Sequence, residues 1–169
     1  MRKIPQLTKS QIQHHLDTLG VNDEVCIVGI RGYYSNSFGK PGNDRGVYDD
    51  AIFVLAPKAF AGFQANVDPS IFKTGIATLK TGIYKAVKHF HQGKYKALQI
   101  VKDTVTRDNR AGDDTGRHGI NFHYGGENET WSEGCQTLPK STYSTFLNLV
   151  YSLMDANDLK EITYVLIEN

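Results

Sequence analysis

Hydrophobic residues occur along this chain mainly in short runs with the spacing of β-strands. Residues 25–30 form a continuous apolar run between turn-forming residues, which is typical of a buried central strand. The less regular segment 75–86 has a turn signal at Thr81 and Gly82, and we expect a strand after that turn. Further runs predict strands at 52–56, 60–66, 97–101, 104–107, 119–123 and 162–167.

Two segments carry helical signals instead. Thr8 can cap a helix start and Gln11 can return the hydrogen bond to the cap, so we expect a short helix that stops at Gly20. Many strands with only two helices fit poorly to repeated βαβ units, so the pattern predicts a mainly β domain with peripheral helices. The second helix is expected within 139–157, where these residues have helical spacing: Tyr143, Phe146, Leu147, Val150 and Met154.

A long polar loop is expected between the strands at 25–30 and 52–56. Residues 31–50 are rich in Gly, Asn, Asp, Ser and Tyr, and 39–44 combines several chain-breaking residues. Loops of this length inside a compact domain are often functional, although a solvated loop is the simpler alternative. Side chains that could contact a substrate here are Arg31, Tyr33, Tyr34, Arg45, Asp49 and Asp50.

Composition and charge limit the classes of partner. With 169 residues, 40% of them hydrophobic, the chain fits one domain, 1–169, with a sizeable core. Lys and Arg number 19 against 18 Asp and Glu, and a net charge of +1 gives no basic surface for nucleic acid. No apolar run approaches the roughly 20 residues that span a bilayer, and no signal-peptide pattern follows Met1. We therefore expect no nucleic acid, no membrane span, and synthesis in the cytoplasm without a signal peptide.

The reactive residue types gather in the segment 118–137. Residues 119–123 alternate apolar and polar side chains, which predicts a half-buried strand with His123 facing outward at its exposed C-terminal end. Turn-forming residues follow, and Gly134 allows a backbone conformation that other residues resist. We therefore expect Cys135 to be displayed on a tight turn, whereas Cys26, inside an apolar run, is expected in the core.

A cysteine beside a histidine can act as a nucleophile. At an unperturbed pKa of about 8.5, only roughly 3% of a thiol is ionised at pH 7, and lowering that pKa by about two units corresponds to roughly 2.7 kcal/mol. His123 precedes Cys135 by enough turn-rich chain to fold back against it and lower the thiol pKa. The N–H groups of Gly134 and Cys135 could then stabilise an oxyanion in acyl transfer through a thioester, which requires no cofactor. Three polar side chains could orient the reacting groups: Asn121, Tyr124 and Ser132.

The local pattern resembles a known family of cysteine enzymes. The segments 123–125 (HYG) and 132–135 (SEGC) are similar to the active-site segment of the L,D-transpeptidase (YkuD-like) family, in which a strand His precedes a Ser/Thr-x-Gly-Cys turn. A fainter similarity lies at 79–84, where only Gly82 and Tyr84 match the family's Thr-Pro-x-Gly-x-Tyr/Phe segment. The pattern looks like the compact variant found in phage and secreted-effector relatives.

The resemblance implies a fold, a reaction and a partner. Family members have a mainly β, sandwich-like catalytic domain and act on peptidoglycan stem peptides, passing the acyl group to an amine or to water. The nucleophile would fall on Cys135 and the general base on His123, in a protein that reaches the cell wall by another route. The chain departs from the pattern at Glu133, where a His is common, at Thr137, where Arg or Asn is common, and in its shorter His-to-Cys spacing.

Two other functions remain open from the sequence. His118 and His123, with Cys135 or with Asp113 and Asp114, could bind zinc in a metal-dependent peptidase, although two strand residues five apart point to opposite faces. A non-catalytic wall-binding module is the second alternative, since aromatic residues such as Trp131 could stack on sugars. The other histidines lie in polar segments, where we expect solvated side chains: His14, His15, His89 and His91.

Overall fold

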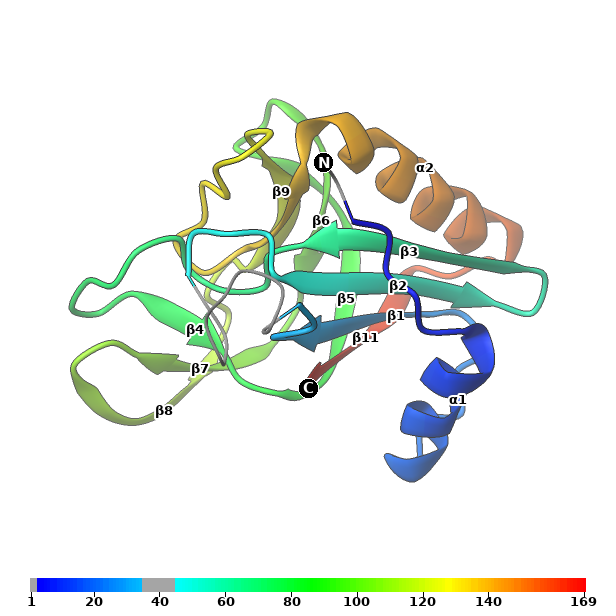
Figure 1. Ribbon diagram of the computed structural model, residues 1–169, viewed down its shortest axis with the longest axis horizontal. Helices are drawn as coiled ribbons and strands as arrows, with labels where there is room; N and C mark the ends of the chain where they lie inside the picture. Colours follow the sequence, from blue (N-terminus) through cyan, green and yellow to red (C-terminus); the bar gives the residue numbers. More distant parts are fainter. Residues whose placement is uncertain (1–2, 35–44) are drawn as a thin grey trace.

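The computed structural model describes residues 3–34 and 45–169, and strands predominate in it (Figure 1). Thr137 and Asn66 join the two edges of the larger sheet, because their backbone groups exchange hydrogen bonds of 2.7 and 2.8 Å, and the sheet is nearly closed. β10 pairs in parallel with β9, and β1 with β11, while all other neighbours are antiparallel. The strand order of this mixed sheet is β10 (Gln136–Pro139), β9 (Asn121–Gly125), β6 (Tyr95–Ile100), β5 (Gly82–His91), β11 (Glu161–Glu168), β1 (Cys26–Arg31), β2 (Asp50–Ala56) and β3 (Ala59–Ala65).

A smaller antiparallel sheet lies at one end of the larger one, on the left in Figure 1. It consists of β4 (Ala77–Leu79), β7 (Asp103–Arg107) and β8 (Arg110–Gly116). β4 runs into β5 through a short turn, and β7 and β8 form a hairpin that projects from the molecule. This small sheet is the feature that places additional side chains beside the Cys135 turn.

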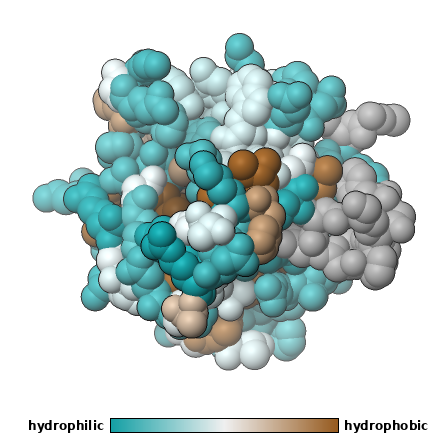
Figure 2. All heavy atoms as spheres, turned by 90° about the vertical axis from the view of Figure 1, so that its left-hand side faces the viewer, coloured by the Kyte–Doolittle hydropathy of each residue, from teal (hydrophilic) through white to brown (hydrophobic). Residues whose placement is uncertain are grey.

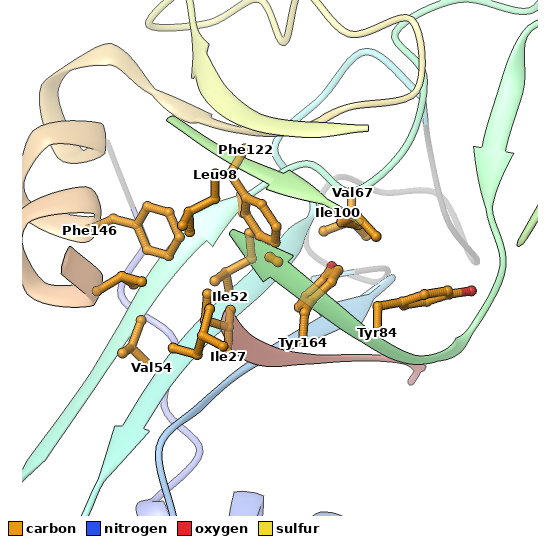
Figure 3. Packing of buried hydrophobic residues seen from close by; sticks show 14 of the residues in the cluster. Ile27, Ile52, Val54, Val67, Tyr84, Leu98, Ile100, Phe122, Phe146 and Tyr164 are labelled. Atoms are coloured by element: carbon orange, nitrogen blue, oxygen red, sulfur yellow. The ribbon is translucent and has the colours of Figure 1, made fainter. Parts of the chain in front are cut away.

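Two helices cover opposite faces of the larger sheet. α2 (Lys140–Ala156) packs Phe146 against the ring of Phe122, with centroids 5.8 Å apart (Figure 3). Phe146 also meets the ring of Phe63, at a centroid distance of 5.6 Å. α1 (Lys9–Thr18) buries Ile12 and Leu16 against the other face. Strands β1 and β2 are therefore buried on both faces, which explains their continuous apolar sequence.

Most of the elements expected from the sequence are confirmed. The Thr8–Gln11 capping box begins α1, the five apolar residues of α2 are buried, and Cys26 is fully buried in the core. Neither of the described helices is long and apolar enough to cross a membrane. The mainly β architecture with two peripheral helices is thus observed.

Three strands were not expected, and the bounds of one strand and one loop differ from the expectation. β4, β8 and β10 were not expected; β4 and β10 are short, and β8 is polar and mostly exposed, so none has a strong apolar alternation. β9 runs over Asn121–Gly125 instead of 119–123, because Gly119, with a φ of 71°, ends the extended conformation before the strand starts. The expected loop 31–50 is shorter than that range, since Arg31 ends β1 and Asp50 begins β2, and its residues 35–44 lie outside the described part.

Candidate functional site

The pairing of β9 with β10 brings Cys135 and His123 onto one surface. Thr137 lies opposite His123 in this parallel register, so Cys135, one residue before β10, lies beside Asn121. Because residues two apart point to the same side of a strand, Cys135, Asn121 and His123 share one face. Gln136 points to the other face, where its Oε1 accepts a 2.7 Å hydrogen bond from the buried Tyr164 hydroxyl. The tertiary structure therefore places the sequence-predicted pair on the same face of the β9–β10 pair.

Ser132 braces the turn that carries Cys135. Its hydroxyl accepts a hydrogen bond of 3.0 Å from the Gly134 N–H and donates one of 2.7 Å to the Cys135 carbonyl. The Ser132 N–H donates to the Ser70 hydroxyl at 2.6 Å, and this bond connects the turn to the loop between β3 and β4. Gly134 therefore cannot offer its N–H to an oxyanion as expected, because Ser132 occupies it, and Ser132 itself is buried and supports the turn.

Gly134 is required by its surroundings. Its φ of 132° lies in a region that other residues avoid, and a Cβ on Gly134 would lie 2.5 Å from the Ala77 carbonyl oxygen. The turn is thus packed directly against β4 of the small sheet. The Gly134 N–H is bonded to Ser132, whereas no group among the described residues accepts a hydrogen bond from the Cys135 N–H.

The surroundings of the Cys135 thiol favour its protonated form. The Asn121 N–H donates to its Sγ at 3.4 Å, but burial raises the pKa of the thiol, and the negative charge of Glu133 raises it further. The expectation that the surroundings lower this pKa is therefore wrong. In the part of the chain that the structure describes, no hydrogen bond joins Cys135 to His123. The pair is a neutral thiol beside an imidazole rather than a preformed ion pair.

His123 is buried rather than exposed at a strand end. It is 7% exposed and lies in the middle of β9, which corrects the sequence expectation. Its Nδ1 is 2.8 Å from the Tyr124 carbonyl oxygen, and because a carbonyl only accepts, Nδ1 carries the proton. Burial lowers the pKa of His123, so the imidazole is neutral, and no donor among residues 3–34 and 45–169 bonds to the lone pair of its Nε2. His123 is thus in the tautomer that a general base needs.

His91 is the site residue that the sequence did not identify. Its ring stacks on the ring of His123, with centroids 4.5 Å apart and planes inclined by 22°. The side-chain amide of Asn121 donates to His91 Nδ1 at 2.8 Å and its oxygen accepts from Gln99 at 3.1 Å, while Arg117 donates to Gln99 at 2.8 Å. The expectation of a solvated His91 is therefore wrong, and only the pairing of β5, β6 and β9 reveals its position.

Tyr124 points away from the thiol face. Its ring stacks on Tyr95 with centroids 4.6 Å apart and meets the ring of Tyr143 on α2 edge-on at 5.7 Å. Burial raises the pKa of Tyr95 to about 12, and nearby Tyr124 and Cys135 also raise it. Tyr124 thus packs between β9 and α2. Tyr95 lies near enough to Cys135 for the thiol to raise its pKa.

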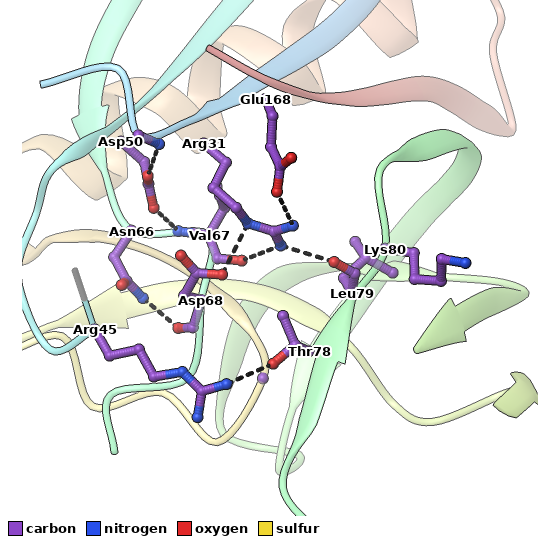
Figure 4. A network of polar contacts seen from close by, with 12 residues as sticks. Arg31, Arg45, Asp50, Asn66, Val67, Asp68, Thr78, Leu79, Lys80 and Glu168 are labelled. Carbon is purple, nitrogen blue, oxygen red and sulfur yellow. Dashed lines mark hydrogen bonds and ion pairs between the residues drawn. The ribbon is translucent and has the colours of Figure 1, made fainter. Parts of the chain in front are cut away.

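Arg31 lies inside the protein instead of on a substrate-facing surface. Its guanidinium forms an ion pair with Asp68 at 2.8 Å and donates to the Leu79 carbonyl at 2.7 Å (Figure 4). Asp50 accepts the backbone N–H groups of Gly32 and Val67 at 2.6 Å each. These contacts fasten the chain segment that leads into β4 onto the large sheet.

The other aromatic and charged residues proposed for the 31–50 region also have internal partners. The Tyr33 hydroxyl accepts from the N–H groups of Gln6 and Leu7 at 2.8 and 3.1 Å, so it anchors the N-terminal segment. The Arg45 guanidinium donates two hydrogen bonds, of 2.6 and 2.8 Å, to the Asp108 carboxylate. Tyr34, Asp49 and Asp50 are buried.

His118 belongs to a different cluster from the thiol. Its Nδ1 bonds to Asp103, its Nε2 lies 3.0 Å from Asp114, and these partners raise the pKa of His118. Asp113 pairs instead with Lys80 at 2.6 Å. Within residues 3–34 and 45–169, no group of three or more His, Cys, Asp or Glu side chains is arranged to hold a metal ion.

Similarity to known proteins adds no assignment. No protein-family model matches the sequence, and no curated protein matches it either.

Proposed function

We propose that this protein is a cysteine acyl-transfer enzyme that acts on peptidoglycan stem peptides, with the catalytic fold of the L,D-transpeptidase type. The observation that carries the proposal is the arrangement of Cys135 and His123 on one face of the β9–β10 pair, with the thiol on a turn braced by Ser132. The HYG and SEGC segments that resemble the family supply the residues of this arrangement.

The neutral tautomer of His123 fits a general-base mechanism. When a substrate carbonyl approaches, Nε2 of His123 takes the thiol proton of Cys135 and the sulfur forms a bond to the carbonyl carbon. The Cys135 N–H donates to the oxyanion of the tetrahedral intermediate. The C–N bond then breaks as His123 returns the proton to the leaving amine, and a thioester remains on Cys135.

The second half of the reaction reverses these roles. Water or an acceptor amine gives a proton to His123 and attacks the thioester carbon, and the sulfur leaves and recovers its proton. Water yields a shortened stem peptide, and an amine yields an exchanged or cross-linked one. His91 and Asn121 keep the His123 ring and the thiol in place during both steps.

Exposed apolar side chains near the turn suit contact with cell-wall glycan, and they also support a wall-binding module as the second candidate function. Trp131 is 56% exposed and Phe72 is 68% exposed. Their two loops are joined by the 2.7 Å hydrogen bond from the Ser70 N–H to the Ser132 carbonyl. Sugars stack favourably on exposed aromatic rings, so these loops could hold the glycan strand beside the thiol.

The test is the incubation of purified protein with muropeptides that carry tetrapeptide stems, with and without an added amine, followed by mass spectrometry. Wild-type protein is expected to remove or exchange the terminal residue and to show a transient acyl adduct on the intact protein. Cys135→Ala should lower the rate by at least about a thousandfold, whereas Cys26→Ala, in the core, should retain activity. Full activity of Cys135→Ala would reject the thiol mechanism. Binding of wall material by wild-type protein without any mass change would establish the binding module instead.

A further inference from the structure

A charged pocket of about 450 Å³ lies next to the Cys135 turn. Its lining comes from the chain before β4, the β7–β8 hairpin and the turn, and includes Lys73, Gly75, Arg107, Arg110, His118 and Glu133. Glu133 is two residues before Cys135, and the intervening Gly134 packs against the Ala77 carbonyl on the pocket wall. The pocket therefore includes one residue, Glu133, of the turn that carries the proposed nucleophile.

The charged groups of this pocket fall into two sets. Arg107 bonds to Asp114 at 2.9 and 3.0 Å, and His118 is held by Asp103 and Asp114. Among the described residues, by contrast, the side chains of Lys73, Arg110 and Glu133 form no ion pair or hydrogen bond. Two cations and one carboxylate are thus available to a ligand.

The backbone beneath these side chains is held in place. Lys73 N–H donates to Asp108 Oδ2 at 3.1 Å and Gly75 N–H to the Asp108 carbonyl at 2.9 Å, while Arg45 grips the same Asp108 side chain. Gly75 has a φ of 85°, and a Cβ there would lie 3.3 Å from Arg110 Nη2, so the guanidinium rests on bare backbone. Arg45 and Arg31 bond to Thr78 and Leu79 in β4, the strand that follows this segment (Figure 4).

We propose that this pocket binds a group that carries both a carboxylate and an ammonium, such as the free end of an amino acid, with Arg110 and Lys73 at the carboxylate and Glu133 at the ammonium. A purely anionic ligand would meet Glu133, and a purely cationic one would meet Lys73 and Arg110, so the mixed set selects a zwitterion. The proposal rests on the proposed function, because the bound group would belong to the peptide whose carbonyl Cys135 attacks.

Occupancy of the pocket has a consequence for the nucleophile. The charge of Glu133 raises the pKa of the Cys135 thiol. An ammonium bound at Glu133 offsets that charge, so the thiolate becomes easier to form when the zwitterionic group is in place. The pocket would thereby couple recognition of the substrate to activation of the thiol.

The test is a titration of ¹⁵N-labelled protein with alanine, N-acetylalanine and alaninamide at pH 7, followed through the backbone amides of Gly75 and Ala77. Alanine should bind more tightly than either capped form by roughly two- to fivefold, the range for exposed charge pairs. Glu133→Gln should abolish the difference between alanine and N-acetylalanine. Arg110→Gln should reduce the difference between alanine and alaninamide, because Lys73 remains at the carboxylate. The control Lys160→Gln, an exposed lysine before β11, should leave all three affinities unchanged.

Other outcomes overturn the assignment. Equal binding of alanine and N-acetylalanine would indicate a simple anion site, and equal binding of alanine and alaninamide a simple cation site. No shift at Gly75 or Ala77 with any of the three would remove the pocket as a ligand site. The titration is repeated on Cys135→Ala, where no turnover occurs. Amino-acid binding without muropeptide activity in the wild-type protein would reject the acyl-transfer function and leave the pocket assignment standing. Muropeptide activity without amino-acid binding would reject the pocket assignment and leave the acyl-transfer function standing.

Discussion

The imidazole rings of His91 and His123 stack 4.5 Å apart at the point where β5, β6 and β9 lie side by side. His123 is in the neutral tautomer that a general base needs. The side-chain amide of Asn121 fixes His91, and the backbone N–H of Asn121 donates to the Cys135 sulfur. A single asparagine thus connects the second histidine with the nucleophile.

Removal of His91 is expected to raise the pKa of His123. Burial lowers that pKa most, and the neighbouring His91 lowers it further, so loss of the like charge stabilises the imidazolium. His91→Phe keeps a stacked ring and is the preferred variant. Histidine ring titration by NMR should show the His123 midpoint at higher pH, and the acid limb of any acyl-transfer rate should move with it. The exposed His14→Gln is the control, and an unchanged His123 midpoint in His91→Phe would show that the stack has no electrostatic role.

Alkylation of the two cysteines should follow their surroundings. Burial and Glu133 raise the pKa of Cys135, so its reaction with iodoacetamide should be slow at pH 7 and still increase above pH 9. Cys26 is fully buried and its pKa is raised to about 12, so it should remain unlabelled in the folded protein. Intact-mass spectrometry over pH 7–10 measures both rates. A Cys135 rate that levels off below pH 8 would instead indicate a preformed thiolate–imidazolium pair.

Gly134→Ala should destabilise the protein strongly. The strained φ costs on the order of 1–3 kcal/mol, and the contact of the new Cβ with the Ala77 carbonyl adds to it. Gly112→Ala is the matched control, because Gly112 also has a positive φ, 82°, but a Cβ there meets nothing within 4 Å. Urea denaturation should show a larger loss for Gly134→Ala than for Gly112→Ala. Equal losses would mean that the turn can move away from β4 without cost.

His118→Gln should destabilise the protein more in acid than in base. The hydrogen bond that His118 donates to Asp103 raises the pKa of His118, and the nearby Asp114, which Arg107 also contacts, raises it further. Stability from a histidine with a raised folded-state pKa is fully present below its unfolded pKa of about 6.5 and is lost as pH rises through the folded pKa. Urea denaturation at pH 5.5 and pH 9 measures the difference, with the exposed His15→Gln as control. A penalty that is equal or larger at pH 9 would contradict the assignment of a charged His118.

The amino-acid sequence by itself determined the main elements of the fold and two residues of the candidate site, Cys135 and His123. Apolar spacing identified β1, β2, β3, β6, β7 and α2, because burial against a sheet or helix imposes a period that can be recognised locally. Strands whose residues pair over short or polar stretches, such as β8 and β10, have no such period and escaped prediction. Cys135 and His123 could be singled out because their residue types and the Ser-x-Gly-Cys turn lie close together in the chain.

Only the tertiary structure decided the surroundings of that pair. His91 comes from β5 and reaches His123 through strand pairing, Lys73 and Arg110 reach the turn from two separate segments, and Arg31 is drawn into the interior by Asp68. The pKa directions of Cys135 and His123 also depend on burial, which no local pattern specifies. The physical reason is that a residue's type sets which chemistry it can perform, whereas its solvation and its neighbours are set by segments far away in the sequence.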